Sequence, residues 1–210
     1  MPTMPKPAAK PTIAVDIDDV LAANAENFVR FSNKRWGTNL KPDDYTEHWA
    51  ELWKVDFDEV DKRRDVIIKE QLFLKHRFFD EAKPVLKKLT KNYKLFVVSS
   101  RSNRIQKDTI DWINKEYGDI FSGIHFADMW NRTDLHILER LKGTKNDVIK
   151  QIGTDYLIDD QPKHCIAAAE AGIKTVLFGD YKWNRGLKLR KNMTRAKNWH
   201  EVLEYFDAQS

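Results

Sequence analysis

The sequence predicts an α/β fold, in which a parallel sheet carries a helical insertion after its first strand. Short runs rich in β-branched and aromatic residues alternate with stretches of helical periodicity, which is typical of parallel sheets. Glycine, proline and capping residues separate these stretches. Between the first two expected strands lie about seventy residues, far more than a crossover connection needs, so we expect this segment to be an insertion.

Five strands and three connecting helices follow from this pattern. The strands are expected at residues 12–16, 94–99, 123–126, 156–158 and 175–178. The helices are expected to begin at Asn103, at Thr144 and near Pro162. Gly118, Gly153 and Gly172 follow the three helices in that order, as glycine commonly does at helix ends.

The segment between the first two strands is helical in pattern and dense in aromatic residues. We place the insertion at residues 24–79 and the sheet-containing core at residues 12–23 and 80–210. Residues 1–11 are rich in proline, alanine and lysine and are expected to form a disordered tail. Most aromatic residues of the insertion are expected to form its own small core, which leaves a few to face a ligand.

The composition indicates an ordinary globular protein. Of 210 residues, 41% are hydrophobic and 32% are charged, which is too apolar for a disordered chain. No apolar run approaches the roughly 20 residues of a membrane helix, and the N-terminus lacks the apolar core of a signal peptide. The single cysteine, Cys165, can form no intrachain disulfide. We therefore expect a cytoplasmic protein without a membrane partner.

One stretch near the C-terminus is strongly basic, although the net charge is only +4. Its basic residues are Lys182, Arg185, Lys188, Arg190, Lys191, Arg195 and Lys197, with no acidic residue between them. Such a stretch attracts anions. Nucleic acid binding would also need aromatic or groove-fitting elements on the same face, so we expect a small anionic substrate rather than nucleic acid.

Three carboxylates, those of Asp16, Asp18 and Asp19, follow the first expected strand. Aspartate is also common at helix starts, where it caps the helix and faces its dipole. Carboxylate oxygens are nevertheless the ligands that Mg²⁺ prefers, and the ion usually combines one or two of them with phosphate oxygens. A phosphate site is therefore the first hypothesis.

Polar residues follow two further strands as well. Residues 99–101, Ser-Ser-Arg, follow the second strand, and the pair Asp159-Asp160 follows the fourth. Lys145 lies at the start of the helix that precedes the fourth strand. Ligands of open parallel sheets bind beyond the carboxyl ends of the strands, so we expect these groups to meet at one site.

Taken in order, these groups resemble the four motifs of the haloacid dehalogenase-like (HAD) superfamily, whose members are mostly Mg²⁺-dependent phosphatases. Asp16-Ile17-Asp18-Asp19-Val20 matches the first motif, Ser99 the second, Lys145 the third and Asp159-Asp160 the fourth. The resemblance spans nearly the whole chain after the tail. It implies a Rossmann-like parallel-sheet core with a small helical cap, which the insertion would form.

Within the superfamily, the chain resembles the 5′(3′)-deoxyribonucleotidase branch through residues 15–22, 157–162 and 177–184. Two positions depart from the usual pattern. Asp19 stands where many relatives have glycine, and its extra charge is expected to alter metal affinity. Ser99 replaces a common threonine and keeps the hydroxyl.

The resemblance implies two roles for the carboxylates of the first motif. Asp16 would attack phosphorus and form an aspartyl-phosphate, which water then hydrolyses. Asp18 would first protonate the leaving alkoxide and then accept a proton from water. For the first task we expect neighbouring like charges to raise the pKa of Asp18.

The resemblance also implies a metal and a phosphate subsite. Mg²⁺ would be held by Asp16, by the backbone carbonyl of Asp18 and by Asp159 or Asp160, and the sequence does not choose between the last two. The phosphate-binding residues would be Ser99, Ser100, Arg101 and Lys145. Lys145 is also expected to keep Asp16 ionised.

The cap is expected to close over small substrates and to give specificity. If the substrate is a nucleotide, the candidates to stack on its base are Trp49, Trp53, Phe73 and Phe79, and the sequence does not choose among them. Such stacking is worth roughly 1–3 kcal/mol in nucleic acid systems.

The leading hypothesis is a Mg²⁺-dependent phosphomonoesterase that acts on a small phosphorylated metabolite, preferably a 5′-nucleotide or deoxynucleotide. A phosphatase of sugar phosphates or other small phosphates is the nearest alternative. A different class of protein, a non-catalytic HAD-fold protein that binds nucleic acid, is the third. The oligomeric state is left open by the sequence.

Overall fold

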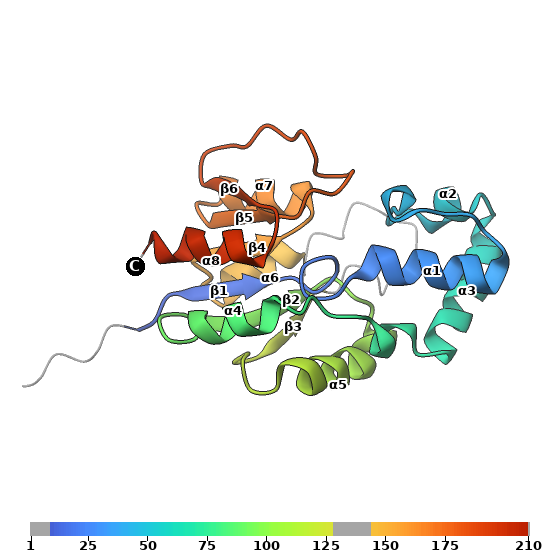
Figure 1. Ribbon diagram of the computed structural model, residues 1–210, viewed down its shortest axis with the longest axis horizontal. Coiled ribbons are helices and arrows are strands. Elements are labelled where there is room, and N and C mark those ends of the chain that lie inside the picture. Colours follow the sequence, from blue (N-terminus) through green and yellow to red (C-terminus); the bar gives the residue numbers. More distant parts are fainter. Residues whose placement is uncertain (1–8, 128–143, 210) are drawn as a thin grey trace, which may run out of the picture.

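The computed structural model describes residues 9–127 and 144–209, and its centre is a parallel sheet. Within this part of the chain six strands pair in the order β3-β2-β1-β4-β5-β6 (Figure 1). The strands are β1 Thr12–Val15, β2 Lys94–Ser99, β3 Ile124–Phe126, β4 Tyr156–Asp159, β5 Lys174–Phe178 and β6 Met193–Ala196. The predicted α/β fold with a parallel sheet is confirmed. Residues 1–8 of the expected tail lie outside the described residues.

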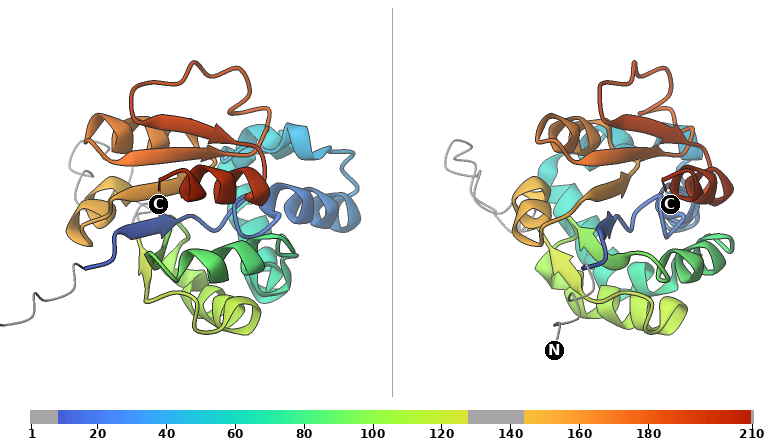
Figure 2. Two further views of the ribbon diagram at one scale, coloured as in Figure 1. Left: turned by 60° about the vertical axis from the view of Figure 1, so that its left-hand side comes forward. Right: turned by 90° about the vertical axis from the view of Figure 1, so that its left-hand side faces the viewer.

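Helices cover both faces of the sheet because successive residues of a strand point to opposite faces. On one face, Ile13 and Val15 of β1 pack in a core with α4 Ala82–Leu89, α5 Gln106–Tyr117 and α8 Trp199–Asp207. On the other face, Ala14 packs with α6 Lys145–Gln151 and α7 Pro162–Glu170. The end-on view of Figure 2 shows these two helical layers with the sheet between them.

The segment after β1 forms a separate helical unit beyond the carboxyl ends of the strands (Figure 1). It contains α1 Asn24–Trp36, α2 Trp49–Trp53 and α3 Phe57–Lys69, with short 3₁₀ turns at Pro42–Asp44 and Leu72–Lys75. Its apolar residues form their own cluster around Phe28, Trp53 and Phe73. Its bounds at residues 24–79 and its role as a cap remain our interpretation of this arrangement.

The structure adds elements that the pattern did not predict. Strand β6 has the sequence Met-Thr-Arg-Ala and lies within the basic stretch, so it shows no apolar alternation. It is held by backbone pairing with β5 and by burial of its two end residues. Helices α4 and α8 are further elements beyond the predicted ones. None of the helices in the described ranges has the length and the apolar character to cross a bilayer.

Candidate active site

The register of the sheet brings the predicted groups to one point. Strand β1 lies between β2 and β4, and Val15 pairs with both Val97 and Ile158. The residues that follow, Asp16 and Asp159, therefore leave the sheet beside each other, with Ser99 on the other side of Asp16. This is the carboxyl edge of the strands, where the helical unit lies opposite (Figure 1).

A first group of side chains, here called the lysine cluster, consists of Asp16, Lys145, Asp159 and Asp160. The ammonium of Lys145 lies 2.7 Å from Oδ1 of Asp16 and 2.7 Å from Oδ2 of Asp159. Lys145 is the first residue of α6, whose N-cap is Thr144 in a capping box. Burial lowers the pKa of Lys145, but the two carboxylates outweigh burial and raise it, so the ammonium stays charged.

Three carboxylates of the lysine cluster are placed to share a cation. Asp16, Asp159 and Asp160 are buried, and each offers an oxygen within 4.8 Å of those of the other two. Asp159 uses both its oxygens, since Oδ2 accepts from Lys145 and Oδ1 from the Gln161 backbone N–H at 2.9 Å. Asp159 is therefore the least available of the three.

Asp160 is the better candidate for direct coordination. Its contacts within the described residues go to Oδ2, which accepts from Gln161 Nε2 at 2.9 Å and from Trp183 Nε1 at 2.7 Å. Burial, followed by the charges of Asp159, Asp16 and Asp19, raises its pKa well above the ordinary value. A cation at this point would relieve that repulsion. The all-oxygen donor set suits a hard divalent ion such as Mg²⁺.

The nucleophile candidate, Asp16, has an elevated pKa. Burial raises the pKa of its carboxyl to about 7, against the opposing charge of Lys145. Lys145 opposes this rise by charge and by a hydrogen bond, and its role in keeping Asp16 ionised stays a prediction.

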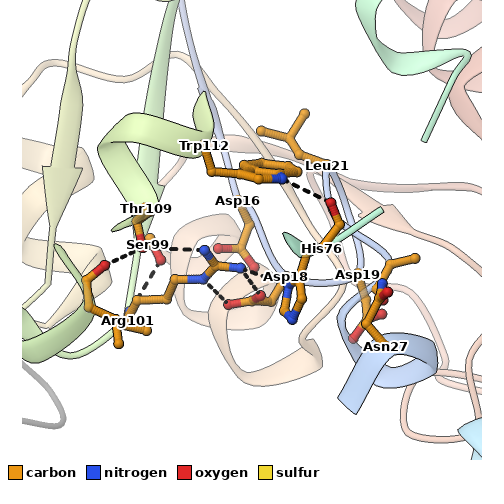
Figure 3. A network of polar contacts seen from close by, with 12 residues as sticks. Asp16, Asp18, Asp19, Leu21, Asn27, His76, Ser99, Arg101, Thr109 and Trp112 are labelled. Atoms are coloured by element: carbon orange, nitrogen blue, oxygen red, sulfur yellow. Dashed lines mark hydrogen bonds and ion pairs between the residues drawn. The ribbon is translucent and has the colours of Figure 1, made fainter. Parts of the chain in front are cut away.

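A second group, here called the arginine cluster, consists of Asp18, Phe73, His76, Arg101 and Thr109. The Arg101 guanidinium donates from Nε to Asp18 Oδ2 at 3.0 Å and from Nη2 to Asp18 Oδ1 at 2.7 Å (Figure 3). Its Nη1 lies 3.3 Å from Thr109 Oγ1, and its Cζ lies 4.9 Å from the centroid of the Phe73 ring. The Arg101 side chain is only 3% exposed.

This pairing corrects the expectation about the pKa of Asp18. Burial raises the pKa of Asp18, but the charge and hydrogen bonds of Arg101 outweigh it and hold the pKa below its ordinary value. Neighbouring carboxylates therefore do not raise the pKa of Asp18 as expected. Two guanidinium nitrogens of Arg101 are engaged by Asp18, and its role in binding phosphate stays a prediction.

Ser99 and Ser100, which precede Arg101 in the chain, are two further candidates for phosphate binding. Ser99 is fully buried, and its Oγ accepts from the Arg101 backbone N–H at 3.1 Å, which leaves the hydroxyl proton for another acceptor. Ser100 is half-buried directly after the strand.

Asp19 stands at a position with φ of +58°, where glycine is usual. Aspartate tolerates this conformation better than most residues. Its carboxylate accepts from the Ala25 N–H at 2.9 and 3.2 Å, in the first turn of α1, whose N-cap residue Ala23 supplies no side-chain cap. Asp19 thus links the first motif to the helical unit.

The four aromatic candidates separate in the structure. Phe73 lies against Arg101 and belongs to the site. Trp49 and Trp53 pack around Phe28 inside the helical unit, with ring centroids 4.8 and 5.4 Å from it. Phe79 packs toward the sheet, 6.2 Å from the ring of Phe178. Trp49 and Trp53 thus share the apolar cluster of the helical unit with Phe73, whereas Phe79 packs against the core of the sheet.

Sequence reasoning missed three residues of the site. His76 contacts Arg101 from 25 residues earlier in the chain and Thr109 from 8 residues later, and neither has a motif that would single it out. Trp183 donates to Asp160 and stacks on Tyr181 with ring centroids 4.7 Å apart. A sequence signal for Trp183 was available, because it lies in residues 177–184, which carry part of the resemblance to the deoxyribonucleotidase branch.

Comparisons with known proteins agree with this geometry. The sequence model of the family described as 5′ nucleotidase, deoxy (pyrimidine), cytosolic type C protein (NT5C) matches residues 10–209. A nucleotidase of Clostridium acetobutylicum is 23% identical over 201 residues, which cover 93% of each chain.

Solved structures show the same fold. A haloacid dehalogenase-like family hydrolase from Streptococcus pneumoniae has a TM-score of 0.68 at 15% identity, and the match covers 94% of this chain and 98% of that one. A Bacillus subtilis HAD-hydrolase, bound to magnesium, has a TM-score of 0.60 at 14% identity, with coverage of 95% and 100%.

Proposed function

The chain belongs to the NT5C family of 5′ nucleotidases and is a HAD-type phosphoric monoester hydrolase, and we propose that its substrate is a small phosphorylated metabolite, preferably a 5′-nucleotide or deoxynucleotide. The observation that carries the proposal is the position of Lys145 between Asp16 and Asp159, with Asp160 in the same carboxylate group. We further propose Mg²⁺ as cofactor, an aspartyl-phosphate intermediate and a cytoplasmic location.

The residues that would hold the metal are Asp16, Asp160 and the backbone carbonyl of Asp18, with Asp159 oriented by Lys145. The bound ion would supply positive charge between the nucleophile and the phosphate. The magnesium in the Bacillus subtilis relative supports the choice of ion.

Asp16 is positioned for nucleophilic attack. Lys145 holds its Oδ1, which fixes the carboxylate and leaves Oδ2 for phosphorus. Attack forms the Asp16–phosphorus bond and breaks the bond from phosphorus to the ester oxygen. The ammonium of Lys145 and the hydroxyl of Ser99 would stabilise the charge on the equatorial oxygens.

Asp18 suits the second half of the reaction. Arg101 keeps its carboxyl ionised, which is the form that accepts a proton from the attacking water. In the first half, Asp18 has to be protonated to donate to the leaving alkoxide. A phosphate dianion bound beside the ion pair favours that form, because a second negative charge raises the pKa of Asp18.

A non-catalytic nucleic-acid-binding protein fits the structure less well. A binding module needs neither a held nucleophile nor a carboxylate paired for proton transfer. Part of the basic stretch is also engaged within the chain: Arg190 pairs with Glu170, and Arg195 donates to the Asn184 carbonyl at 2.7 Å. Arg195 is thus held by contacts within the chain and does not point along a phosphate backbone.

The test is phosphate release from nucleoside monophosphates, sugar phosphates and p-nitrophenyl phosphate, with Mg²⁺ or with EDTA, and with Asp16→Asn as control. We expect metal-dependent release that the variant lacks, and the fastest ester identifies the substrate class. Release that persists in EDTA or in Asp16→Asn contradicts the mechanism. No release from any ester, together with salt-sensitive binding of RNA or DNA, contradicts the proposed function.

A further inference from the structure

The loop that follows β5, residues 179–185, carries an aromatic side chain to the lysine cluster. It begins at Gly179, whose φ is +82°, and a Cβ at this position would overlap the ring of Tyr181. Only glycine therefore lets Tyr181 fold back over the start of the loop. The ring of Trp183 is stacked on that of Tyr181, with an angle of 10° between the two planes.

A buried asparagine fixes the loop beside Asp160. Asn184 is 1% exposed, and its Nδ2 donates to the backbone carbonyls of Phe178 and Asp160, in both cases at 2.9 Å. Its Oδ1 accepts from Nη1 of Arg195 at 3.1 Å. The ends of β4 and β5 and a side chain of β6 are thus joined through the residue that directly follows Trp183. The fold therefore sets the position of Trp183 relative to Asp160.

The indole of Trp183 contacts the carboxylate of Asp160. Its Nε1 donates to Oδ2 at 2.7 Å, and the side-chain amide of Gln161 donates to the same oxygen at 2.9 Å. The indole also meets the ring of Tyr45 in the helical unit edge-on, with centroids 6.0 Å apart. An indole N–H can only donate, so Trp183 itself is no metal ligand. Its hydrogen bond acts on the orientation of Asp160.

The orientation of a carboxylate decides how it can bind a cation. The last torsion of an aspartate is broad and roughly two-fold, so a carboxylate without partners turns easily. Both hydrogen bonds that Asp160 accepts at its carboxylate from the described residues end on Oδ2, which leaves Oδ1 for the cation. Mg²⁺ demands near-ideal octahedral geometry, whereas Ca²⁺ accepts flexible sites and carboxylates that bind through both oxygens. A carboxylate that is held through one oxygen and offers the other therefore favours Mg²⁺.

We propose that Trp183 is a positioning residue of the metal site: its indole N–H holds Oδ2 of Asp160 and thereby makes the site selective for Mg²⁺ over Ca²⁺. The inference rests on the proposed metal site, in which Asp160 is a ligand. Hydrogen-bond partners of metal ligands typically contribute roughly 10- to 100-fold to metal affinity. The alternative is that Trp183 only packs the loop, and in that case its ring matters and its N–H does not.

The experiment measures the affinities of the unmodified protein and of three variants for Mg²⁺ and for Ca²⁺ by calorimetry, with each ion titrated alone at one fixed pH. Trp183→Phe removes the N–H and keeps an aromatic ring in the stack. Gln161→Leu removes the second donor to Oδ2. Trp199→Phe is the matched control, because the N–H that it removes donates to the Val20 carbonyl at 3.0 Å and not to a carboxylate.

We expect Trp183→Phe to lower the affinity for Mg²⁺ about tenfold and the affinity for Ca²⁺ by less than about twofold. Gln161→Leu should shift the preference in the same direction, because it frees the same oxygen. Trp199→Phe should leave the ratio of the two affinities unchanged, even where it lowers stability. Circular dichroism checks that each variant is folded.

An unchanged ratio in Trp183→Phe overturns the inference, whether both affinities fall equally or neither falls. An equal shift in Trp199→Phe also overturns it, because the loss of any indole hydrogen bond would then have the same effect. If Trp183→Phe does not fold, Gln161→Leu decides, and an unchanged ratio in that variant overturns the inference.

The proposed function is judged separately, by phosphate release from the unmodified protein. Metal-dependent release together with an unchanged ratio in Trp183→Phe contradicts the inference alone. A changed ratio without release from any ester upholds the inference and contradicts the function.

Discussion

Asp16 and Asp18 are two residues apart, yet the fold gives them opposite electrostatic environments. Asp16 belongs to the lysine cluster, which residues of the sheet core form, and burial raises its pKa to about 7. Asp18 belongs to the arginine cluster, which also draws Phe73 and His76 from beyond β1, and Arg101 lowers its pKa. In the lysine cluster one cation is shared by two carboxylates, whereas Arg101 has one carboxylate in bidentate contact.

The comparison shows that the positions of two aspartates in one motif do not determine their pKa values, which here shift in opposite directions. Two aspartates of the same motif acquire separate roles because their neighbours come from different parts of the chain. The lysine cluster, with three carboxylates and one ammonium, favours a further cation, and the paired charges of Arg101 and Asp18 do not.

The largest expected effect is the loss of phosphate release when either Asp16 or Asp18 is replaced. Asp16→Asn removes the nucleophile, so phosphate release should fall by about 10⁴-fold or more. Asp18→Asn removes the proton-transfer group and should lower kcat by roughly 10²–10⁴-fold. Steady-state kinetics with a saturating ester measures both. Near-normal turnover in either variant would contradict the assigned roles.

The second prediction concerns the buried ammonium. Lys145→Met leaves two buried carboxylates without their cation and should lower the free energy of unfolding by about 3–5 kcal/mol. Lys163→Met is the control, because Lys163 pairs with Glu47 near the surface and its loss should change stability by about 0–1 kcal/mol. Urea unfolding measures both. Similar values for the two variants would show that the buried ion pairs of Lys145 contribute no more to stability than an exposed ion pair.

The third prediction uses the pH dependence of the arginine cluster. The pKa of Asp18 is lowered in the folded protein, so its stabilising contribution is present above its ordinary value of 3.8 and is lost as the pH falls below it. Arg101→Gln should therefore destabilise the protein by about 1–2 kcal/mol at pH 6 and by much less near pH 3. Unfolding in urea at several pH values gives the difference. A constant difference would mean that Arg101 stabilises by packing alone.

The smallest expected effect concerns the pH dependence of metal binding at the lysine cluster. The pKa of Asp16 is raised to about 7, so its carboxyl has to lose a proton before it can bind a metal. The affinity for Mg²⁺ should rise about tenfold from pH 6 to pH 8, with proton release at the lower pH. Calorimetry in two buffers of different ionisation enthalpy measures both. An affinity that does not change with pH would place Asp16 in its ionised form already.

The sequence indicated much of the fold because its signals were local. Glycine and capping residues marked the ends of α5, α6 and α7, and the strands β1, β2 and β4 appeared as short apolar runs. The position of β6 was missed because its pairing with β5, rather than its own pattern, makes it a strand. Register is a property of two segments at once, and neither carries it alone.

Some features of the candidate site could likewise be predicted from the sequence, and others could not. The motif residues could be placed together because parallel strands end at the same edge of a sheet. The bond between Arg101 and Asp18 could not be predicted, since it depends on the turn after β2 aiming a long side chain across the site. Trp49, Trp53, Phe73 and Phe79 were equivalent in the sequence, and packing alone selected Phe73.

The sequence by itself determined the fold class, the family and the set of groups at the carboxyl edge of the sheet, since these depend on periodicity and on motifs within single segments. The tertiary structure alone decided which carboxylate is paired with which cation, and that His76 and Thr109 contact Arg101 beside them. The physical reason is that protonation and recognition depend on burial and on contacts over a few ångströms, and those contacts join residues far apart along the chain.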